Sequence, residues 1–539
     1  MTRILIRCDA SFSIGSGHVI RCRTLARMLL QQGAEVVFIC RRQPGDLIAL
    51  LEKEFRVLAL PEQELALCDG LEGRKLYESW LGCSQAQDAH DCLKALSLAK
   101  TGKSDWLVVD HYGLDAKWQS EVKIGLGEDA YTKLLVIDDL ANRPHLADLL
   151  LDQNFLGAAS EQRYQGLVPT DCRQLIGPHY ALLGPEYSQL QPLVPLRKQL
   201  SRVLIFFGGV DSDNLSGRAL EALMDADLAH VAVDVVLGRQ TLHRKKVTNL
   251  IAQRAKTTLH GPLPSLAGLI ARADIAIGAG GATTWERACL KLPTLMITIA
   301  ANQRPIAKAL DQAGHCKLLG DATTVSVEQI RAELLSQITN SVESFHDAGS
   351  NLTDGNGASR LALSVLGPQS AIKLRRVEEK DEAVLLRWAN DYQVRANSFS
   401  RNPISPSAHK QWFSKGLNDP NRLLLIATTE EDIPIGQIRF DRQLLHANSG
   451  GHEATIDLSI DRCARGYGLA VEMLRLGLQT MEEHWGPGID AVAEVLASNA
   501  ASNACFSRAN FAKERALIGI PRDRGVIRWH KASPHGRPQ

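Results

Sequence analysis

A histidine lies directly after a glycine-rich turn near the start of the chain. The segment 13–17 reads SIGSG, and His18 follows it at the head of a stretch with helical apolar spacing. The apolar run at 4–6 is typical of a buried strand, so the pattern predicts strand, turn and helix. Gly15 and Gly17 would let a ligand approach the free N–H groups of the helix start. The positive helix end disfavours imidazolium, so we expect a neutral His18 that accepts a proton.

Polar residues end the apolar strands that the sequence predicts farther along, at 36–41, 106–113, 134–145 and 149–154; residues 44–100 are expected to be mostly helical. Carboxyl ends of parallel strands share one edge of a sheet, where ligands bind. We therefore expect Asp110, His111 and Tyr112 to converge with His18 on one substrate-binding crevice. A single aspartate at a strand end is more often a cap or turn former.

A second glycine-rich loop occurs in a repeat of the same strand and helix alternation. A connector at 186–200 precedes the repeat, whose predicted strands start the segments 202–214, 231–238, 273–293 and 294–305. Gly280 and Gly281 precede Thr283 and repeat the anion-binding logic of the first loop. Glu286 falls in the first turn of the helix that follows. It either interacts with the helix dipole or binds a ribose diol.

These alternations predict an α/β chain with two doubly wound, Rossmann-type domains at 1–190 and 200–360, which would face each other across a ligand cleft. A linker at 361–372 and a third domain at 373–535 follow. The balance of 61 basic and 60 acidic residues gives no footprint for nucleic acid or an anionic membrane. The 11 cysteines include no CxxC pair, which favours a reducing cytoplasm, and no metal site is expected.

The third domain has an α+β pattern. The sequence predicts a strand that starts in 373–379, a helix at 381–391 and consecutive antiparallel strands at 423–428, 433–441 and 454–461, with a further strand at 489–499. The segment that follows residue 461 matches R-x-x-G-x-A directly before a long helix, with Arg465, Gly466, Tyr467, Gly468, Leu469 and Ala470. Backbone N–H groups at such a helix start would hold a pyrophosphate.

The motifs of the first two domains resemble a known enzyme family. DASFSIGSGHVIRC, WLVVDHYGLD, IDDLANRPH, FFGGVDSDN and IGAGGATTWERACL look like the UDP-2,4-diacetamido-2,4,6-trideoxy-β-L-altropyranose hydrolases of pseudaminic acid biosynthesis, over roughly residues 1–360. The resemblance implies a GT-B-like pair of domains and hydrolysis to UDP and the free sugar, with inversion. It implies His18 as the catalytic residue, and nucleotide binding by Gly280, Gly281, Thr283, Glu286, Asn302 and Gln303.

Residues 373–533 resemble the GNAT N-acetyltransferases, which implies acetyl-CoA as cosubstrate held by the loop 465–470. The N…A…F…F pattern of that family is similar to Asn503, Ala504, Phe506 and Phe511. Many members have a tyrosine where this chain has Phe506, so the general acid is unassigned. Asn499 is expected to shape the acetyl-CoA groove, and Glu453 and Asp457 are candidates for the base.

The combined interpretation is a cytoplasmic, bifunctional enzyme that acetylates the 4-amino precursor of a UDP-sugar and then hydrolyses the product. Its partners would be a UDP-sugar and acetyl-CoA, with no nucleic acid or membrane. Two alternatives remain open: a UDP-sugar glycosyltransferase of the GT-B type, or a hydrolase whose C-terminal domain is an inactive CoA- or sugar-binding module. His18 would act either as the base or as a group that orients the diphosphate.

Overall fold

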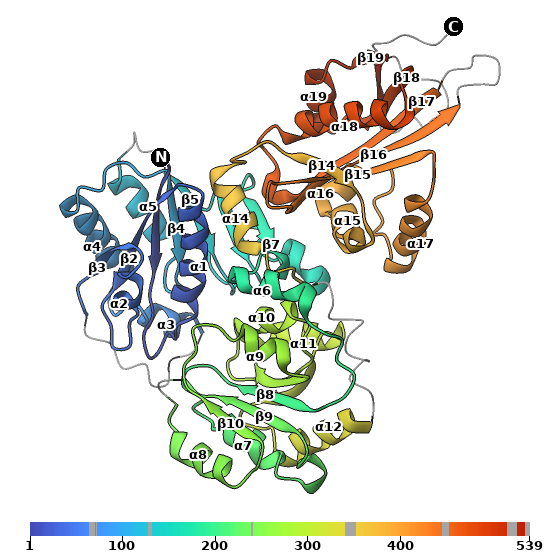
Figure 1. Ribbon diagram of the computed structural model, residues 1–539. Coiled ribbons are helices and arrows are strands. Elements are labelled where there is room, and N and C mark those ends of the chain that lie inside the picture. The colour runs from blue at the N-terminus through green and yellow to red at the C-terminus, as the bar shows by residue number, and fades with distance from the viewer. Residues whose placement is uncertain are drawn as a thin grey trace. The chain divides into compact units, whose positions relative to one another are not determined.

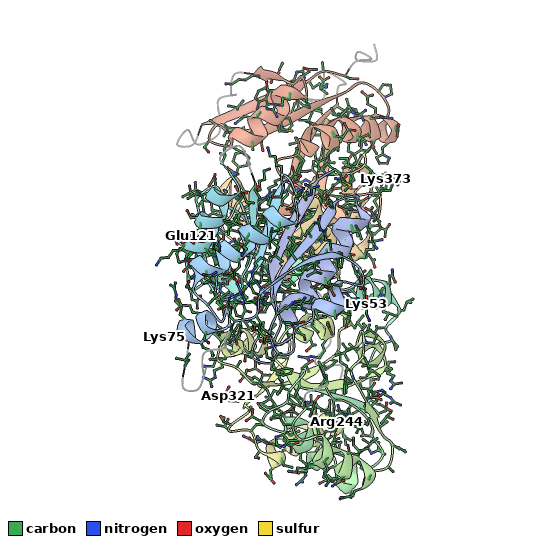
Figure 2. The ribbon with its side chains drawn as sticks, turned by 90° about the vertical axis from the view of Figure 1, so that its left-hand side faces the viewer. Lys53, Lys75, Glu121, Arg244, Asp321 and Lys373 are labelled. Atoms are coloured by element: carbon green, nitrogen blue, oxygen red, sulfur yellow. The ribbon has the colours of Figure 1, made fainter. Side chains whose placement is uncertain are left out.

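The computed structural model describes residues 1–63, 71, 73–127, 132–238, 241–339, 352–444, 452–514 and 525–533. The chain divides into two compact units, Met1–Val365 and Leu366–Gln539 (Figure 1). Charged side chains such as Lys53, Glu121 and Lys373 project from the outer faces (Figure 2), and the apolar strands and helix faces form the interior.

The first sheet has seven parallel strands in the order β3-β2-β1-β4-β5-β6-β7. The strands are β1 (Arg3–Cys8), β2 (Glu35–Arg41), β3 (Arg56–Leu60), β4 (Trp106–Asp110), β5 (Lys133–Ile137), β6 (Leu149–Asp152) and β7 (Arg173–Ile176). The helices around it are α1 (Gly17–Gln31), α2 (Ile48–Leu51), α3 (Gly73–Ser79), α4 (Gln85–Leu98) and α5 (Ala116–Gly125). Alternate residues of each strand point to opposite faces, so Leu5 and Val109 pack with Trp118 of α5 while Ile4 and Ile6 lie on the other face. The strand β3 lies inside the stretch expected to be mostly helical, which corrects that expectation.

The second sheet has six parallel strands in the order β10-β9-β8-β11-β12-β13. They are β8 (Arg202–Phe206), β9 (Ala232–Val236), β10 (Thr257–His260), β11 (Ile275–Ala279), β12 (Thr294–Thr298) and β13 (Lys317–Asp321). One face packs on α7 (Leu215–Ala222), α8 (Arg244–Ala252) and α12 (Val327–Thr339), and the other on α9 (Ala267–Arg272), α10 (Thr283–Cys289) and α11 (Gln303–Gln312). Helices on both faces make this a second doubly wound sheet, so the predicted pair of Rossmann-type domains is confirmed.

The segments that join the two Rossmann-type domains contain helices that the predicted connector and linker did not include. The expected connector at 186–200 is partly helical, with α6 at Pro185–Leu190, and Tyr187 packs into the second core. The helical segment expected to end at about Leu366 is present as α14 (Gly357–Leu366), so the expected linker at 361–372 is wrong in its first half. This helix returns to the first domain, where the Val365 carbonyl accepts from Trp106 Nε1 at 3.1 Å.

A buried ion pair anchors this returning helix. The fully buried guanidinium of Arg360 donates to both carboxylate oxygens of Asp354, at 2.5 and 2.6 Å, and to the His179 carbonyl at 3.2 Å. Replacement Arg360→Met would remove the guanidinium from that carboxylate, which would keep only the Asn356 N–H at 3.0 Å, and would remove a donor from the His179 carbonyl. We expect the free energy of unfolding of the first unit, measured by urea denaturation, to fall by about 2–3 kcal/mol. The exposed pair of Arg304 and Asp321 is the control, since Arg304→Met should cost less than about 1 kcal/mol; equal losses would contradict the prediction.

The second unit is a seven-stranded sheet in the order β14-β15-β16-β17-β18-β20-β19. Its strands are β14 (Lys373–Arg376), β15 (Arg422–Thr428), β16 (Pro434–Leu444), β17 (His452–Ile460), β18 (Ile489–Leu496), β19 (Ala512–Glu514) and β20 (Val526–Lys531). Its helices are α15 (Glu382–Ala389), α16 (Tyr392–Ala396), α17 (Pro406–Leu417), α18 (Leu469–Trp485) and α19 (Ala500–Arg508). All neighbouring pairs are antiparallel except β17 and β18. The α+β third domain is confirmed.

Candidate functional site

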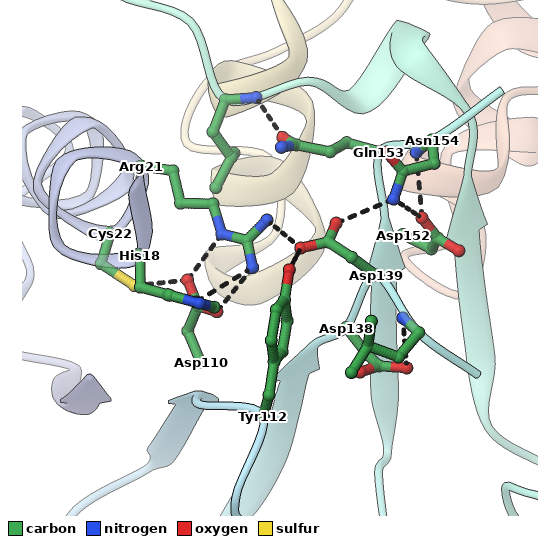
Figure 3. A network of polar contacts seen from close by, with 12 residues as sticks. His18, Arg21, Cys22, Asp110, Tyr112, Asp138, Asp139, Asp152, Gln153 and Asn154 are labelled. Atoms are coloured by element: carbon green, nitrogen blue, oxygen red, sulfur yellow. Dashed lines mark hydrogen bonds and ion pairs between the residues drawn. The ribbon is translucent and has the colours of Figure 1, made fainter. Parts of the chain in front are cut away.

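The first turns of α1 bring His18, Arg21 and Cys22 to one helix face, because residues three and four apart lie side by side. That face meets Asp110 at the end of β4. The His18 Nδ1 lies 2.6 Å from Asp110 Oδ1, Arg21 Nε donates to Oδ2 at 2.7 Å, and the Cys22 thiol lies 3.3 Å from Oδ2 (Figure 3). The predicted convergence of His18 with the end of β4 is therefore present.

Asp110 fixes the chemistry of the His18 ring. A carboxylate against Nδ1 accepts its N–H, which keeps the proton of the neutral ring on Nδ1 and leaves Nε2 as the acceptor. Among the residues described, none is hydrogen-bonded to Nε2. The ring is thus oriented with one nitrogen held and one available.

The neighbouring carboxylates are strongly coupled to Arg21. Burial by itself would raise the pKa of Asp110, but the Arg21 guanidinium and His18 outweigh it and hold that pKa well below its usual range. Arg21 Nη1 also donates to Asp139 Oδ2 at 2.6 Å, at the end of β5. Asp139 in turn accepts from Asn154 Nδ2 at 2.9 Å, after β6. The edge of the sheet thus carries a continuous polar network.

Tyr112 and His111 differ in their placement. The Tyr112 ring meets the His18 ring edge-on with centroids 4.5 Å apart, and its hydroxyl donates to Asp139 at 2.5 Å. His111 is buried and faces the interior: its Nδ1 accepts from the Gly113 N–H at 3.0 Å, and its Nε2 lies 3.6 Å from Asp9. Burial lowers the pKa of His111 to about 4, so this ring is neutral and has a structural environment.

The glycines of the first loop leave open space. Gly15 has a φ of +80°, and its N–H donates to the Ser11 carbonyl at 2.8 Å, which closes the turn before α1. A Cβ at Gly15 or Gly17 would meet no atom within 4 Å. The backbone beside His18 is therefore accessible to a ligand.

The second glycine loop, between β11 and α10, lies against the next loop of its sheet. A Cβ on Gly280 would come within 3.4 Å of Gln303 Oε1, and one on Gly281 within 3.9 Å of Gln303 Nε2. Gln303 Oε1 also accepts from the Ile299 N–H at 3.1 Å. Asn302 is the residue before α11, adjacent to this contact. The predicted residues of these two loops are thus neighbours.

The first turn of α10 holds a carboxylate with an unused oxygen. Glu286 is hydrogen-bonded to Tyr187, while its Oε2 is buried and has no partner among the described residues. Burial raises the pKa of Glu286, and the Tyr187 contact offsets this only in part. Thr283 accepts from the buried Arg287 at 3.0 Å, so its hydroxyl oxygen is already engaged. Of these two predicted residues, Glu286 carries the free acceptor.

In the second unit, β17 and β18 pair only over residues 452–455 and 489–492 and then diverge. Residues 456–460 and 493–496, beyond the paired part, line a cavity of about 930 Å³. The loop before α18 and the start of α19 complete this wall. Diverging strands expose backbone groups that a ligand can pair with.

The loop 465–470 has the geometry expected of an anion site. Gly466 and Gly468 have φ of +89° and +77°, and a Cβ on either would meet no atom within 4 Å. Arg465 is held by Gln393 at 2.5 Å and by Asp391 at 3.1 Å, so its guanidinium fixes the loop. All residues of this loop except Tyr467, which lies beside Gly367, line the cavity.

The remaining predicted residues of this domain fall into two groups. Asn499 lines the cavity and caps α19 by accepting from the Ser502 N–H at 3.1 Å, and Asp457 also lines the cavity. Asn503 does not line it: its amide donates to the Leu496 carbonyl at 3.0 Å and accepts from Trp529. Glu453 is likewise absent from the lining and is paired with Arg528 at 2.5 Å.

Two groups at the first site were not predicted. Arg21 could have been found, since it lies three residues after His18 on a predicted helix and so shares its face. Asp139 follows a predicted strand, but its contact with Arg21 depends on the order of β4 and β5 in the sheet, which the local sequence does not contain.

Residues 372–512 match the acetyltransferase (GNAT) domain family. The spore coat polysaccharide biosynthesis protein SpsG of Bacillus subtilis is 24% identical over 361 residues, 66% of this chain and 95% of SpsG. The UDP-2,4-diacetamido-2,4,6-trideoxy-β-L-altropyranose hydrolase of Campylobacter jejuni is 29% identical over 230 residues, 43% of this chain and 69% of the hydrolase. The crystal structure of Acinetobacter baumannii MurG aligns with 67% of this chain and 98% of its own, at 15% identity and a TM-score of 0.45.

Within the described part of the chain, no helix is long and apolar enough to cross a membrane. The motif resemblances at both ends of the sequence agree with these matches. The chain therefore joins a segment homologous to a UDP-sugar hydrolase to a GNAT acetyltransferase domain at residues 372–512.

Proposed function

We propose that the first unit hydrolyses UDP-2,4-diacetamido-2,4,6-trideoxy-β-L-altropyranose to UDP and the free sugar, with His18 as the general base. The observation that carries this proposal is the His18 ring at the start of α1, with Nδ1 held by Asp110 at 2.6 Å and Nε2 available. The substrate is that of the similar Campylobacter jejuni hydrolase.

In this reaction the water oxygen bonds to the anomeric carbon of the sugar, and the bond from that carbon to the diphosphate breaks. The water proton passes to Nε2 of His18, and the positive charge that forms on the ring is stabilised by Asp110. The bond electrons leave with UDP, whose charge the N–H groups of the helix starts and glycine loops would stabilise. Direct attack by water inverts the anomeric centre.

We also propose that the GNAT domain acetylates the 4-amino group of the UDP-sugar precursor, so that one chain performs two consecutive steps. Acetyl-CoA would supply the acetyl group, its pyrophosphate at the loop 465–470 and its thioester arm between the diverging strands β17 and β18. Asp457 lines the same cavity and accepts from Gln437 at 2.8 Å. It is the carboxylate we propose to take up the amine proton.

Proton NMR of the full chain with the UDP-diacetamido sugar tests the hydrolase. Release of UDP and the free sugar supports the proposal, and a folded protein that releases no UDP refutes the substrate. Thiol release from acetyl-CoA with the 4-amino UDP-sugar tests the second activity. Acetyl-CoA binding without turnover would favour the alternative of an inactive binding module.

Replacement Glu286→Gln is expected to weaken UDP binding. The change keeps the contact with Tyr187 but removes the charge beside the unpartnered Oε2, so we expect the Kd for UDP, by titration calorimetry, to rise about 10-fold. Because burial raises the pKa of Glu286, protonation should weaken UDP binding in the wild type already above the ordinary glutamate range as pH falls. Glu333→Gln on α12 is the control; an equal effect there would contradict the assignment.

A further inference from the structure

Arg21 binds two carboxylates, those of Asp110 and Asp139. Its Nε and Nη2 grip the two Asp110 oxygens at 2.7 and 2.6 Å, which prevents the carboxylate from rotating. Its third donor, Nη1, reaches Asp139 at 2.6 Å (Figure 3). Apolar residues of similar volume often stabilise a fold as well as a buried ion pair does, so this network is weak evidence for a stabilising role.

Asp139 connects to the groups that contact the His18 ring, which are Asp110, Tyr112 and Arg21 itself, whose Nη2 lies 3.4 Å from Nδ1. It reaches Asp110 through Arg21, and it accepts from the hydroxyl of Tyr112, whose ring meets the imidazole edge-on at 82°. The Asn154 amide occupies the other oxygen of Asp139 at 2.9 Å. Because both of its oxygens are engaged, Asp139 holds Arg21 and Tyr112 in place. It thereby fixes the contacts that Asp110 and Tyr112 make with the imidazole.

We propose that Arg21 and Asp139 are positioning residues for the hydrolase: Arg21 fixes the Asp110 carboxylate, Asp139 anchors Arg21 and Tyr112, and together they hold the His18 ring with Nε2 presented. The inference rests on the proposed function of His18. In this proposal Arg21 and Asp139 act through His18 and do not themselves contact the water or the sugar.

Steady-state kinetics of Arg21→Lys, Arg21→Gln and Asp139→Asn in the full chain provide the test. We expect kcat for UDP release to fall about 10- to 100-fold with KM unchanged. Lysine keeps the positive charge but cannot donate to both Asp110 oxygens at once. Only Arg21→Gln removes the charge that offsets the burial of Asp110, so only this variant should raise the pKa of Asp110 and move the acid limb of the kcat profile to higher pH. Arg27→Lys is the matched control, since Arg27 lies on the same helix and pairs with Glu54 at the surface.

A second readout does not need turnover. The ring nitrogen signals of His18, assigned by difference against His18→Ala, should report the Nδ1–H tautomer in the wild type and a mixture in Arg21→Gln. If the variants at Arg21 and Asp139 do not fold, Tyr112→Phe provides a milder test, because it removes one hydrogen bond to Asp139 and keeps the aromatic ring. It should lower kcat by a smaller factor and shift the same signals.

The outcomes separate the two claims. A tautomer change without any UDP release from the wild type would refute the hydrolase proposal, and would show only that Arg21 orients the His18 ring. Unchanged kcat, pH profile and ring signals in the folded variants would overturn the inference. Lower kcat that tracks only the loss of folded protein, with the same pH profile and tautomer, would also overturn it and leave Arg21 with a purely structural role.

Discussion

His18→Ala should lower kcat for UDP release from the diacetamido UDP-sugar about 10²- to 10⁴-fold, the range expected when a general base is removed. The alanine variant keeps the helix start and its N–H groups, so KM should change little. NMR of the sugar anomeric signal measures both the rate and the inversion. Binding of UDP, followed by calorimetry, should be retained.

Asp110→Asn separates the two roles considered for His18. If His18 is the base, the amide can present N–H to Nδ1, favour the wrong tautomer and lower kcat severely while the ring remains in place. If His18 only orients the diphosphate, His18→Ala should instead raise KM and the Kd for UDP, with a modest loss of kcat. A full rate in the folded His18→Ala protein would refute both roles.

In the two parallel sheets the central strands could be predicted from sequence, and the edge strands β3 and β10 could not. Strands such as β1 and β4 are buried on both faces and appear as continuous apolar runs. The edge strands β3 and β10, with sequences RVLAL and TTLH, are mostly half-buried and carry polar residues, so their pattern resembles that of loops. The helical segment expected to end at about Leu366 is present as α14, and only the start of the linker was placed too early, at residue 361.

The same distinction applies to the site. His18 and the end of β4 follow from local motifs plus one rule about parallel sheets. The contact of Arg21 with Asp139 needs the two strand ends to be adjacent, and the neutral state of His111 depends on its burial, which outweighs the neighbouring Asp9. Asn503 shows that a match to a motif does not by itself place a residue in the site. Its side-chain amide is engaged with the Leu496 carbonyl and Trp529 and does not line the cavity.

Gly468→Val should raise the Kd for acetyl-CoA about 10²-fold. Gly468 has a φ of +77° directly before α18, and a β-branched residue there costs about 1–2 kcal/mol and tilts the first helical turn. The N–H groups of Gly466 and Gly468 would then no longer converge on a pyrophosphate, and each lost charge-assisted hydrogen bond costs about 1.5–3 kcal/mol. Titration calorimetry with acetyl-CoA, and thiol release with the amino UDP-sugar, measure the effect.

Gly486→Val supplies the matched control, because Gly486 ends the same helix with a φ of +85° and does not line the cavity. Both variants introduce strain of the same kind, so both should lower the unfolding midpoint of the second unit. Only Gly468→Val should lose acetyl-CoA, and UDP release by the first unit should be normal in both. Retained acetyl-CoA affinity in Gly468→Val would show that the pyrophosphate is held elsewhere, whereas equal losses in both variants would trace the effect to stability.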